Sequence, residues 1–419
     1  MFPDVCTNMP LFLSLVFFSA IYGMTGPAGS AAAASPIAAT RNELSVDDFR
    51  FNGPIGSAGA RIEKLGTNHF RVTLSHAPQH PDWANNCQFQ ITGNAKGNRL
   101  LLEVEFQHPK PQYLFDEYFH SWSYDGRGWR PVRWKEKSSG RHNRLEFPMF
   151  EQGRVEFGLQ VPLSQEESVR MLEAWSKNRC CRLHVLGRSL GGRPLYRLEI
   201  TDPDSPHPRR VRWGHYFANQ HPGEHNSQWR MVGMIDWLLS DAGANLRRRS
   251  ICHFILMMSP DAPSQGWYRV NGQGIDMNRS YRIAGADSNL QAHEAYVFQK
   301  DLEQIMASES PIADAWSMHT WGGNVDPMLF PGPEIGARLG AKELLGELLV
   351  KHDPRKLVRP LHFPKMEGDT MWSSGPHRQF GISTVLCEGA GDILTEQDNR
   401  DSGVVILRAL DGYYRELRQ

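Results

Sequence analysis

The chain has 419 residues, of which 40% are hydrophobic and 22% are charged. This composition is typical of a globular protein of two or three domains, and it excludes a disordered or fibrous chain. Its 46 basic residues balance 46 acidic ones. A nucleic-acid-binding protein usually carries a basic surplus, so we expect no nucleic acid among the partners.

The cysteines indicate no disulfide framework. The chain has six cysteines, with no CxxC pair and no metal-finger spacing. Cys6 precedes the N-terminal apolar segment, and Cys180 and Cys181 are neighbours that rarely bond each other. We expect at most one incidental disulfide bond.

The N-terminus has the pattern of an export signal. Residues 11–24 are apolar but too short to span a bilayer, and a small-residue tract, GPAGSAAAASP, follows. We therefore predict a secretory signal peptide over residues 1–34, followed by cleavage and no stable membrane insertion. The first ten residues contain no Lys or Arg, which leaves a retained anchor or a wrongly assigned start as alternatives. The prediction is an exported protein, periplasmic or secreted, if the signal is real, and a cytoplasmic one otherwise.

Residues 46–165 predict an antiparallel β-sandwich domain. Short segments such as HFRVTLSHA and RLLLEVEF alternate apolar and polar residues, and Gly, Asn and Asp interrupt them. Aromatic residues gather between Trp83 and Trp134. We favour core packing for them over a ligand-binding platform, because a small sandwich needs bulky side chains in its interior.

Residues 166–181 predict a linker helix. The segment SQEESVRMLEAWSK has helical spacing, and Ser164 with Glu167 forms a candidate capping box at its start. In residues 182–419, apolar strand-like segments alternate with longer helical ones. This alternation predicts an α/β domain whose mixed, mostly parallel central sheet is flanked by helices.

Three residues form a candidate metal site. His221 and Glu224 lie three residues apart, after a predicted strand, and Pro222-Gly223 between them favours a turn. Catalytic zinc usually takes three protein ligands. His319 is the best third ligand because it too follows a short apolar strand. His225, next to Glu224, is the local alternative.

Several segments resemble the M14 metallocarboxypeptidases, specifically the cytosolic-carboxypeptidase-like branch. NQHPGEHNSQW is similar to the zinc motif of the family, and HVLGRSLGGRPLYRLEI is similar to its first strand pair. The segment MMSPDAPSQGWYRVNGQGIDMNRSY resembles a third family block, with Ser259, Ala262 and Met277 as departures. DWANNCQFQITG and SYDGRGWRPV resemble the N-terminal sandwich of that branch. The resemblance covers roughly residues 46–410 and implies a metallocarboxypeptidase-like fold.

The resemblance implies a role for each site residue. His221, Glu224 and His319 would hold one Zn²⁺ per chain, with a water molecule in the open position. Glu388 follows the apolar segment ISTVLC, as the catalytic Glu of the family follows its strand. It would take a proton from the water and pass it to the leaving amine.

Two arginines and an asparagine complete the implied site. Asn278 and Arg279 match the pair with which the family binds the terminal carboxylate of its substrate, a task suited to the forked guanidinium. Arg269 matches the arginine that stabilises the oxyanion of the tetrahedral intermediate. Without the resemblance, both arginines would be interpreted as surface ion pairs.

Some family features are absent. The segment before Glu388 contains no Tyr to cap the substrate, which leaves Trp372 or His377 as candidates. Ser317 stands where an acidic residue often orients the ligand histidine, and a missing carboxylate would weaken that orientation. Three basic residues are available for the pocket of the substrate's last side chain, and no spacing distinguishes among Arg282, Lys365 and Arg378.

The sequence thus predicts a zinc metallocarboxypeptidase that hydrolyses C-terminal residues from peptides or proteins. One alternative is a zinc amidohydrolase or deacylase acting on N-acyl amino acids, since Asn278 and Arg279 would bind the carboxylate of these compounds in the same way. Another is a catalytically impaired relative that binds peptides or glycans. The sequence leaves the oligomeric state open.

Overall fold

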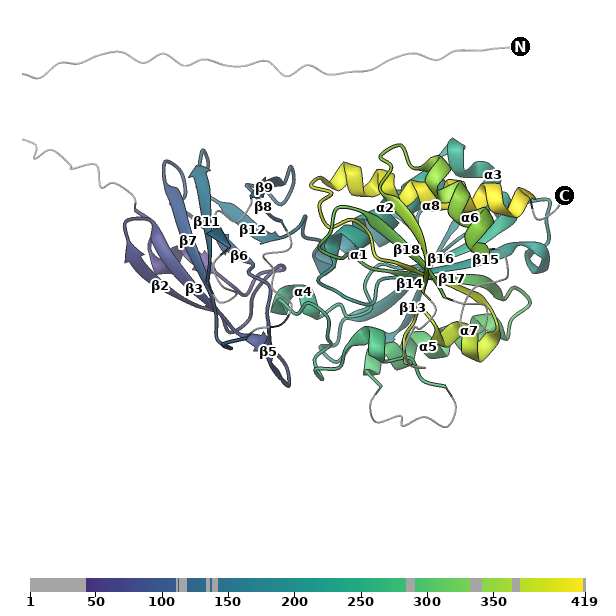
Figure 1. The fold of residues 1–419 in the computed structure, drawn as a ribbon, viewed down its shortest axis with the longest axis horizontal. Helices are drawn as coiled ribbons and strands as arrows, with labels where there is room; N and C mark the ends of the chain where they lie inside the picture. Colours follow the sequence, from purple (N-terminus) through teal and green to yellow (C-terminus); the bar gives the residue numbers. More distant parts are fainter. Residues whose placement is uncertain are drawn as a thin grey trace, which may run out of the picture. The chain divides into compact units, whose positions relative to one another are not determined.

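The computed structural model describes residues 43–416, apart from 111, 113–118, 133–135, 138–141, 284–290, 332–340 and 364–369. The segment interpreted as a signal peptide, residues 1–34, therefore lies outside the described residues. Within the described part, an N-terminal β region (residues 43–163) precedes an α/β region (residues 164–416), as Figure 1 shows.

The N-terminal β region contains two five-stranded sheets, in the orders β1-β6-β12-β8-β9 and β10-β11-β7-β3-β2. Their apolar side chains form one buried cluster. The elements are η1 (Val46–Asp48), β1 (Phe49–Arg50), β2 (Arg61–Gly66), β3 (His69–Leu74), β4 (His76–Ala77), β5 (His80–Ala84), β6 (Phe89–Ile91), β7 (Arg99–Phe106), β8 (His120–Ser123), β9 (Arg130–Val132), β10 (Glu136–Lys137), β11 (His142–Met149) and β12 (Val155–Leu159).

Sequence alternation accounts for the main strands of this region. In β3, Phe70, Val72 and Leu74 are buried, whereas the residues between them are partly exposed. The strand pairs are antiparallel except β3 with β7, which are parallel. The chain between these two strands passes through β6 in the other sheet, so it returns to the first sheet in the same direction. Of the aromatic group, Trp122 and Tyr124 pack in the core, whereas Trp134 lies outside the described residues.

The α/β region is built on one eight-stranded sheet in the order β13-β14-β16-β15-β17-β20-β18-β19. The four pairs β15–β16, β15–β17, β17–β20 and β18–β19 are parallel and the other three are antiparallel. This confirms the predicted mixed sheet. The strands are β13 (Cys181–Arg188), β14 (Pro194–Ile200), β15 (Trp213–Ala218), β16 (Ser250–Ile255), β17 (Ile312–Met318), β18 (Asp326–Pro331), β19 (Val358–Phe363) and β20 (Ser383–Cys387).

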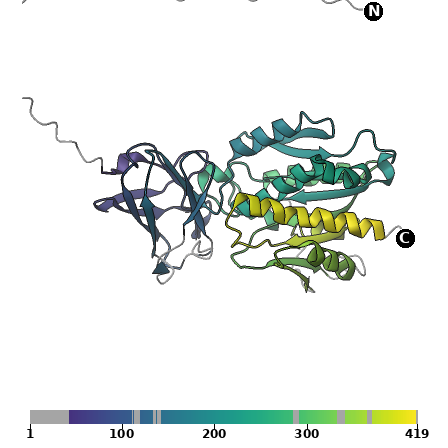
Figure 2. The ribbon, with the colours of Figure 1, turned by 90° about the horizontal axis from the view of Figure 1, so that it is seen from above.

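Helices cover both faces of this sheet (Figures 1 and 2). Helices α2 and α8 pack on one face with α6 beside α8, and α5 and α7 lie on the other. Gly403 lets α8 approach α2 closely, because a Cβ there would lie 2.0 Å from the Arg230 carbonyl oxygen. The helices are α1 (Gln165–Trp175), η3 (Arg209–Val211), α2 (His225–Leu239), η4 (Asp241–Gly243), α3 (Ala244–Arg249), α4 (Ala262–Gln265), η5 (Met277–Arg279), α5 (His293–Met306), α6 (Ala341–His352), α7 (Gly375–Phe380) and α8 (Glu396–Glu416).

Two expectations about crosslinks and membranes can be compared with the described residues. Cys87, Cys180, Cys181, Cys252 and Cys387 are all free thiols, which agrees with the predicted absence of a disulfide framework. No described helix combines the length and the apolar character needed to cross a bilayer.

The N-terminal cap of α1 forms as the sequence predicts. The Ser164 side chain accepts a 3.0 Å hydrogen bond from the backbone N–H of Glu167. The helix then ends at Trp175, and β13 begins at Cys181. The cap satisfies one of the backbone donors that a helix leaves unpaired in its first turn.

We expect Ser164→Ala to lower the free energy of unfolding by about 1 kcal/mol, because the Glu167 N–H loses its acceptor. Ser164→Asp keeps an acceptor and should unfold like the wild type. Chemical denaturation of the three proteins measures the difference, and equal stability of the alanine variant would contradict the capping role.

A buried ionic network lies between β14, β16 and α5. The Arg197 guanidinium donates to Asp301 at 2.7 Å and to Nδ1 of His253 at 2.9 Å, and Glu199 lies 3.7 Å from it. Burial, reinforced by the neighbouring Arg197, lowers the pKa of His253 to about 3. His253 is therefore a neutral hydrogen-bond acceptor for Arg197 at neutral pH.

This pKa predicts acid sensitivity of the fold. Between pH 6.5 and about 3 the unfolded chain binds a proton at residue 253 that the folded chain does not bind, so stability falls as the pH falls. His253→Gln keeps an acceptor for Arg197 and should make this dependence shallower by about 1.4 kcal/mol per pH unit. Denaturation curves at several pH values test this, with exposed His293→Gln as the control. An unchanged slope in His253→Gln would refute the assignment.

Candidate metal centre

The site residues lie at one edge of the eight-stranded sheet. His221 and Glu224 belong to the loop between β15 and α2, His319 directly follows β17, and Glu388 directly follows β20. Strands β15, β17 and β20 are adjacent and parallel, so their carboxyl ends meet at the same edge. The side chain of Asn219 donates to the Met318 carbonyl oxygen at 3.2 Å and holds the ends of β15 and β17 together.

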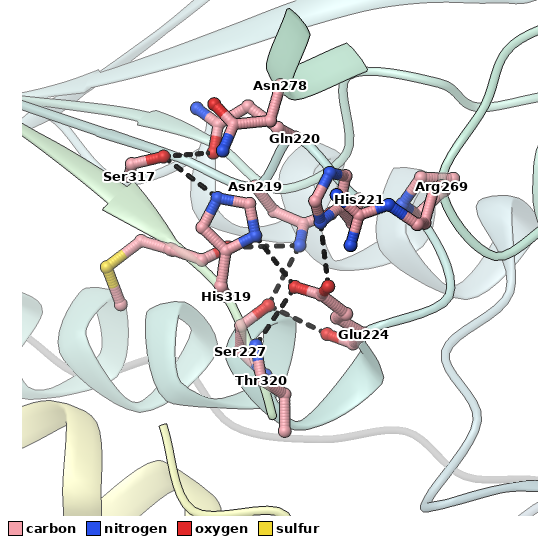
Figure 3. Close-up of polar contacts among 12 residues, drawn as sticks. Asn219, Gln220, His221, Glu224, Ser227, Arg269, Asn278, Ser317, His319 and Thr320 are labelled. Atoms are coloured by element: carbon pink, nitrogen blue, oxygen red, sulfur yellow. Dashed lines mark hydrogen bonds and ion pairs between the residues drawn. The ribbon is translucent and has the colours of Figure 1, made fainter. Parts of the chain in front are cut away.

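The structure brings His221, Glu224 and His319 together (Figure 3). Nδ1 of His221 lies 2.7 Å from one carboxylate oxygen of Glu224, and Nδ1 of His319 lies 2.8 Å from the other. One ligand atom from each residue lies within 4.8 Å of the other two, and all three residues are buried. Two imidazole nitrogens and a carboxylate form a donor set that suits zinc.

Electrostatics keep the carboxylate of this cluster ionised. Burial by itself would raise the pKa of Glu224, but the histidines 221 and 319 outweigh it and hold the pKa well below its usual range. The backbone N–H of Thr320 also donates to Glu224 at 2.9 Å. For His221, burial and Arg269 act to lower the pKa, yet Glu224 and Asp276 raise it overall. The cluster is therefore built around a fixed negative charge.

Asp276 supports His221 from the outer side, and our sequence analysis did not single it out. Its carboxylate lies 3.0 Å from Nε2 of His221 and also accepts from Nε of Arg269 at 3.0 Å. It caps η5 by accepting from the N–H of Asn278 at 2.8 Å. Its position two residues before Asn278, inside the matching DMNR segment, was the available signal.

A different pair of side chains supports His319. The Ser317 hydroxyl lies 2.9 Å from Nε2 of His319, and it donates to Oε1 of Gln220 at 2.7 Å (Figure 3). All three side chains are buried. Ser317, where the family often has an acidic residue, thus contacts the histidine directly, and Gln220 is a second residue that the sequence analysis missed.

The predicted substrate-binding residues lie on η5, beside the cluster. Asn278 is buried, and its Oδ1 accepts from the backbone N–H of Trp372 at 3.1 Å. This contact directs the amide NH₂ of Asn278 away from Trp372. Arg279 is exposed, and its guanidinium donates to the Asn278 carbonyl oxygen at 3.1 Å. Arg269 lies next to His221 in Figure 3.

Glu388 lies close enough to the cluster to interact with its charges. Burial raises its pKa, His319 and His221 act in the opposite direction, and Glu224 adds to the increase. Two backbone hydrogen bonds fix Glu388. Its N–H donates to the Pro327 carbonyl oxygen at 3.0 Å, and its carbonyl oxygen accepts from the Trp321 N–H at 2.8 Å. A partly buried carboxyl group beside a metal-type cluster is a candidate general base.

The side chains of three alternative residues make other contacts. Nδ1 of His225 faces the Leu163 N–H at 3.3 Å and Gln228 at 3.1 Å, outside the cluster. Trp372, a candidate cap, is buried in the core against Tyr281. His377 bonds the Ile382 carbonyl oxygen at 2.8 Å. Lys365, considered for the specificity pocket, lies outside the described residues.

A hairpin of the N-terminal β region holds the segment that carries Asp276 and Asn278. At the β4–β5 turn, the Gln79 amide donates to the Gln273 carbonyl oxygen at 2.8 Å, and Nε2 of His80 donates to that of Gly274 at 2.7 Å. Gly274 has φ +75°, and a Cβ there would lie 2.3 Å from the Pro78 carbonyl oxygen. The close approach requires glycine at this position.

Sequence comparisons agree with this geometry. Residues 169–318 match the zinc carboxypeptidase family, peptidase family M14. Cytosolic carboxypeptidase 2 of Danio rerio is 43% identical over 112 residues, covering 26% of this chain and 16% of the relative. Cytosolic carboxypeptidase 3 of Mus musculus is 34% identical over 258 residues, covering 53% of this chain and 24% of the relative. The chain thus spans less than a quarter of the length of these relatives.

Solved structures share the fold. A metallo-carboxypeptidase from Burkholderia cenocepacia superposes with a TM-score of 0.74 at 17% identity, covering 88% of this chain and 99% of that one. A metallo-carboxypeptidase from Pseudomonas aeruginosa gives 0.69 at 19% identity, covering 88% and 100%. These matches confirm the expected fold class, an α/β metallocarboxypeptidase-like unit preceded by a region of mainly antiparallel sheet.

The prediction of an exported protein is wrong on this comparison, because the curated relatives are named cytosolic carboxypeptidases. The apolar segment and alanine tract suggested a secretory signal, but residues 1–10 lack the basic charge that normally begins one. An apolar segment followed by small residues is therefore insufficient to predict export here.

The family match covers the part of the chain that holds His221 and Glu224, the first two residues of the candidate metal cluster. Residues 169–318 are thus similar to the M14 zinc carboxypeptidases, and the relatives that the chain matches in part are cytosolic carboxypeptidases.

Proposed function

We propose that this protein is a zinc-dependent carboxypeptidase that removes C-terminal residues from peptides or proteins. The observation that carries the proposal is the buried cluster of His221, Glu224 and His319 at the sheet edge, with Glu388 and Arg269 within electrostatic reach of it. The names of the relatives favour a cytoplasmic site of action.

The three ligand residues fit a single zinc ion. Their donor atoms converge within 4.8 Å, and each oxygen of the Glu224 carboxylate faces Nδ1 of one of the two histidines. Three protein ligands leave one position for water, as catalytic zinc sites require. When bound, zinc would lower the pKa of that water to about 7 and polarise the scissile carbonyl group.

Glu388 is the proposed proton carrier. Its raised pKa makes its carboxylate a better base than an exposed glutamate, because burial disfavours the charged form. It would accept a proton from the attacking water and deliver it to the amine of the departing residue. Its fixed backbone holds the carboxyl group in place through both transfers.

Substrate binding is assigned to Asn278 and Arg279 of η5 and to Arg269. The Asn278 amide and the Arg279 guanidinium would bind the terminal carboxylate, a bidentate arrangement that favours an exopeptidase. Arg269, held by Asp276 beside His221, would stabilise negative charge on the carbonyl oxygen during attack. N-acyl amino acids carry the same carboxylate and are the alternative substrates. Comparing hydrolysis of peptides with hydrolysis of N-acyl amino acids distinguishes the two activities.

We expect about one zinc ion per chain by elemental analysis and none in the His221→Ala/Glu224→Ala variant, because two of three ligands are lost. Glu388→Gln should keep its zinc while turnover of a C-terminal peptide library falls by about 10²- to 10⁴-fold, since only the proton carrier is removed. Wild-type protein that binds no zinc, or a Glu388→Gln variant with full activity, would refute the proposal.

We expect Arg279→Met to reduce kcat/KM for free C-terminal peptides by about 10- to 100-fold, through loss of a charge-assisted contact with the carboxylate. On peptides with an amidated C-terminus, which lack that carboxylate, the variant and the wild type should have the same kcat/KM. Arg210→Met is the matched control, because Arg210 is exposed on η3, at the opposite end of β15 from His221. Equal losses on both substrates would argue against carboxylate recognition.

A further inference from the structure

The orientation of the Gln220 amide sets the direction of the hydrogen bonds around Ser317. Oε1 of Gln220 is an acceptor only, so the single hydroxyl proton of Ser317 is donated to it at 2.7 Å. The hydroxyl oxygen therefore accepts in its second contact, from Nε2 of His319 at 2.9 Å. Nε2 must then carry a proton, and in the neutral imidazole this leaves Nδ1 with a free lone pair.

Nδ1 is the nitrogen of His319 that faces the cluster, 2.8 Å from Glu224. We propose that Ser317 and Gln220 are positioning residues that fix His319 in its Nε2–H form, with the lone pair of Nδ1 directed at the metal. This inference rests on the proposed zinc function and deepens it. It assigns to a neutral hydroxyl–amide pair the orienting task that a carboxylate often performs for metal-bound histidine.

Burial makes the hydrogen bonds of Gln220 and Ser317 decisive for the protonation of His319. Gln220, Ser317 and His319 are each exposed by 2% or less, so water has little access to replace a lost partner. The opposite amide orientation would make Gln220 donate to Ser317 and Ser317 donate to Nε2. That arrangement places a proton on Nδ1, where it blocks metal binding. The amide orientation of Gln220 thus selects the metal-binding form.

Both proposed ligand histidines are held through Nε2, the nitrogen that faces away from the cluster. Nε2 of His221 bonds the carboxylate of Asp276 at 3.0 Å, whereas Nε2 of His319 bonds a hydroxyl group. Gln220 precedes His221 in the chain, so the support of His319 comes partly from the loop that provides the other two ligands. Loss of Ser317 should therefore weaken metal binding without removing a ligand.

The test is zinc affinity, measured by competition with a chromophoric chelator on the full-length protein. We expect Ser317→Ala to bind zinc about 10- to 100-fold more weakly than the wild type. Ser317→Thr keeps the hydroxyl and should retain wild-type affinity. Gln220→Met should weaken binding, and adding it to Ser317→Ala should cost nothing more, because both changes break the same chain of hydrogen bonds.

A matched control and a spectroscopic measurement separate positioning from general stability. Ser250→Ala removes another buried strand hydroxyl, on β16, whose partner is the Leu246 carbonyl oxygen, and it should leave zinc affinity unchanged. In zinc-loaded protein with ¹⁵N-labelled histidine, wild type and Ser317→Thr should show His319 protonated at Nε2 alone. Ser317→Ala should lose that fixed signal.

The outcomes distinguish this inference from the proposed function. Wild type that binds zinc, with Ser317→Ala binding equally well, overturns the positioning role and leaves the zinc enzyme intact. A His319 protonated at Nδ1 in zinc-loaded protein also overturns it. A wild type that binds no zinc overturns both the proposed function and this inference.

Discussion

The carboxylate of Glu224 is the group around which the site is organised. It is buried, and its two oxygens lie within 2.8 Å of histidines that come from the ends of two different strands. A buried carboxylate without partners costs several kcal/mol, so the fold must supply compensating groups at fixed positions. The two imidazoles and the Thr320 N–H provide this compensation. The same contacts fix the loop after β15 against the end of β17.

The N-terminal β region contributes to this arrangement although it provides none of the proposed ligands. Its hairpin turn bonds the carbonyl oxygens of Gln273 and Gly274, just before Asp276. Further backbone bonds join Gly56 to Pro263 at 3.0 Å and Asn86 to Gly266 at 2.7 Å. The segment that carries Arg269, Asp276 and Asn278 has little regular structure of its own. It therefore depends on the neighbouring region for its conformation.

The two histidines proposed as ligands have different hydrogen-bond partners at Nε2. Each needs a partner at Nε2 that leaves Nδ1 directed at the cluster. Asp276 supplies this partner to His221 with a charge that Arg269 balances. Ser317 supplies it to His319 without a charge, through Gln220. A second carboxylate would place more negative charge beside Glu224 and Glu388. A neutral pair avoids that repulsion at the cost of a weaker hydrogen bond.

The sequence by itself determined individual elements and the candidate ligands. Alternation in HFRVTL and the capping pattern at Ser164 are local signals, and the structure contains the strand and the cap. His221, Glu224 and His319 could be predicted as candidate ligands because the first two share the HPGE segment and the third follows a short apolar strand. His319 was preferred to His225 because it follows an apolar strand, and the structure turns His225 towards Leu163.

Only the tertiary structure decided which side chains support those ligands. Gln220 and Ser317 are 97 residues apart, and His221 and Asp276 are 55 apart, so no local spacing links them. The parallel pairing of β3 with β7 likewise depends on a crossover through the second sheet. A strand end or a cap is set by its neighbours in the chain. The partner of a buried imidazole is set by which strands pack side by side, because burial requires a partner without specifying where in the sequence it lies.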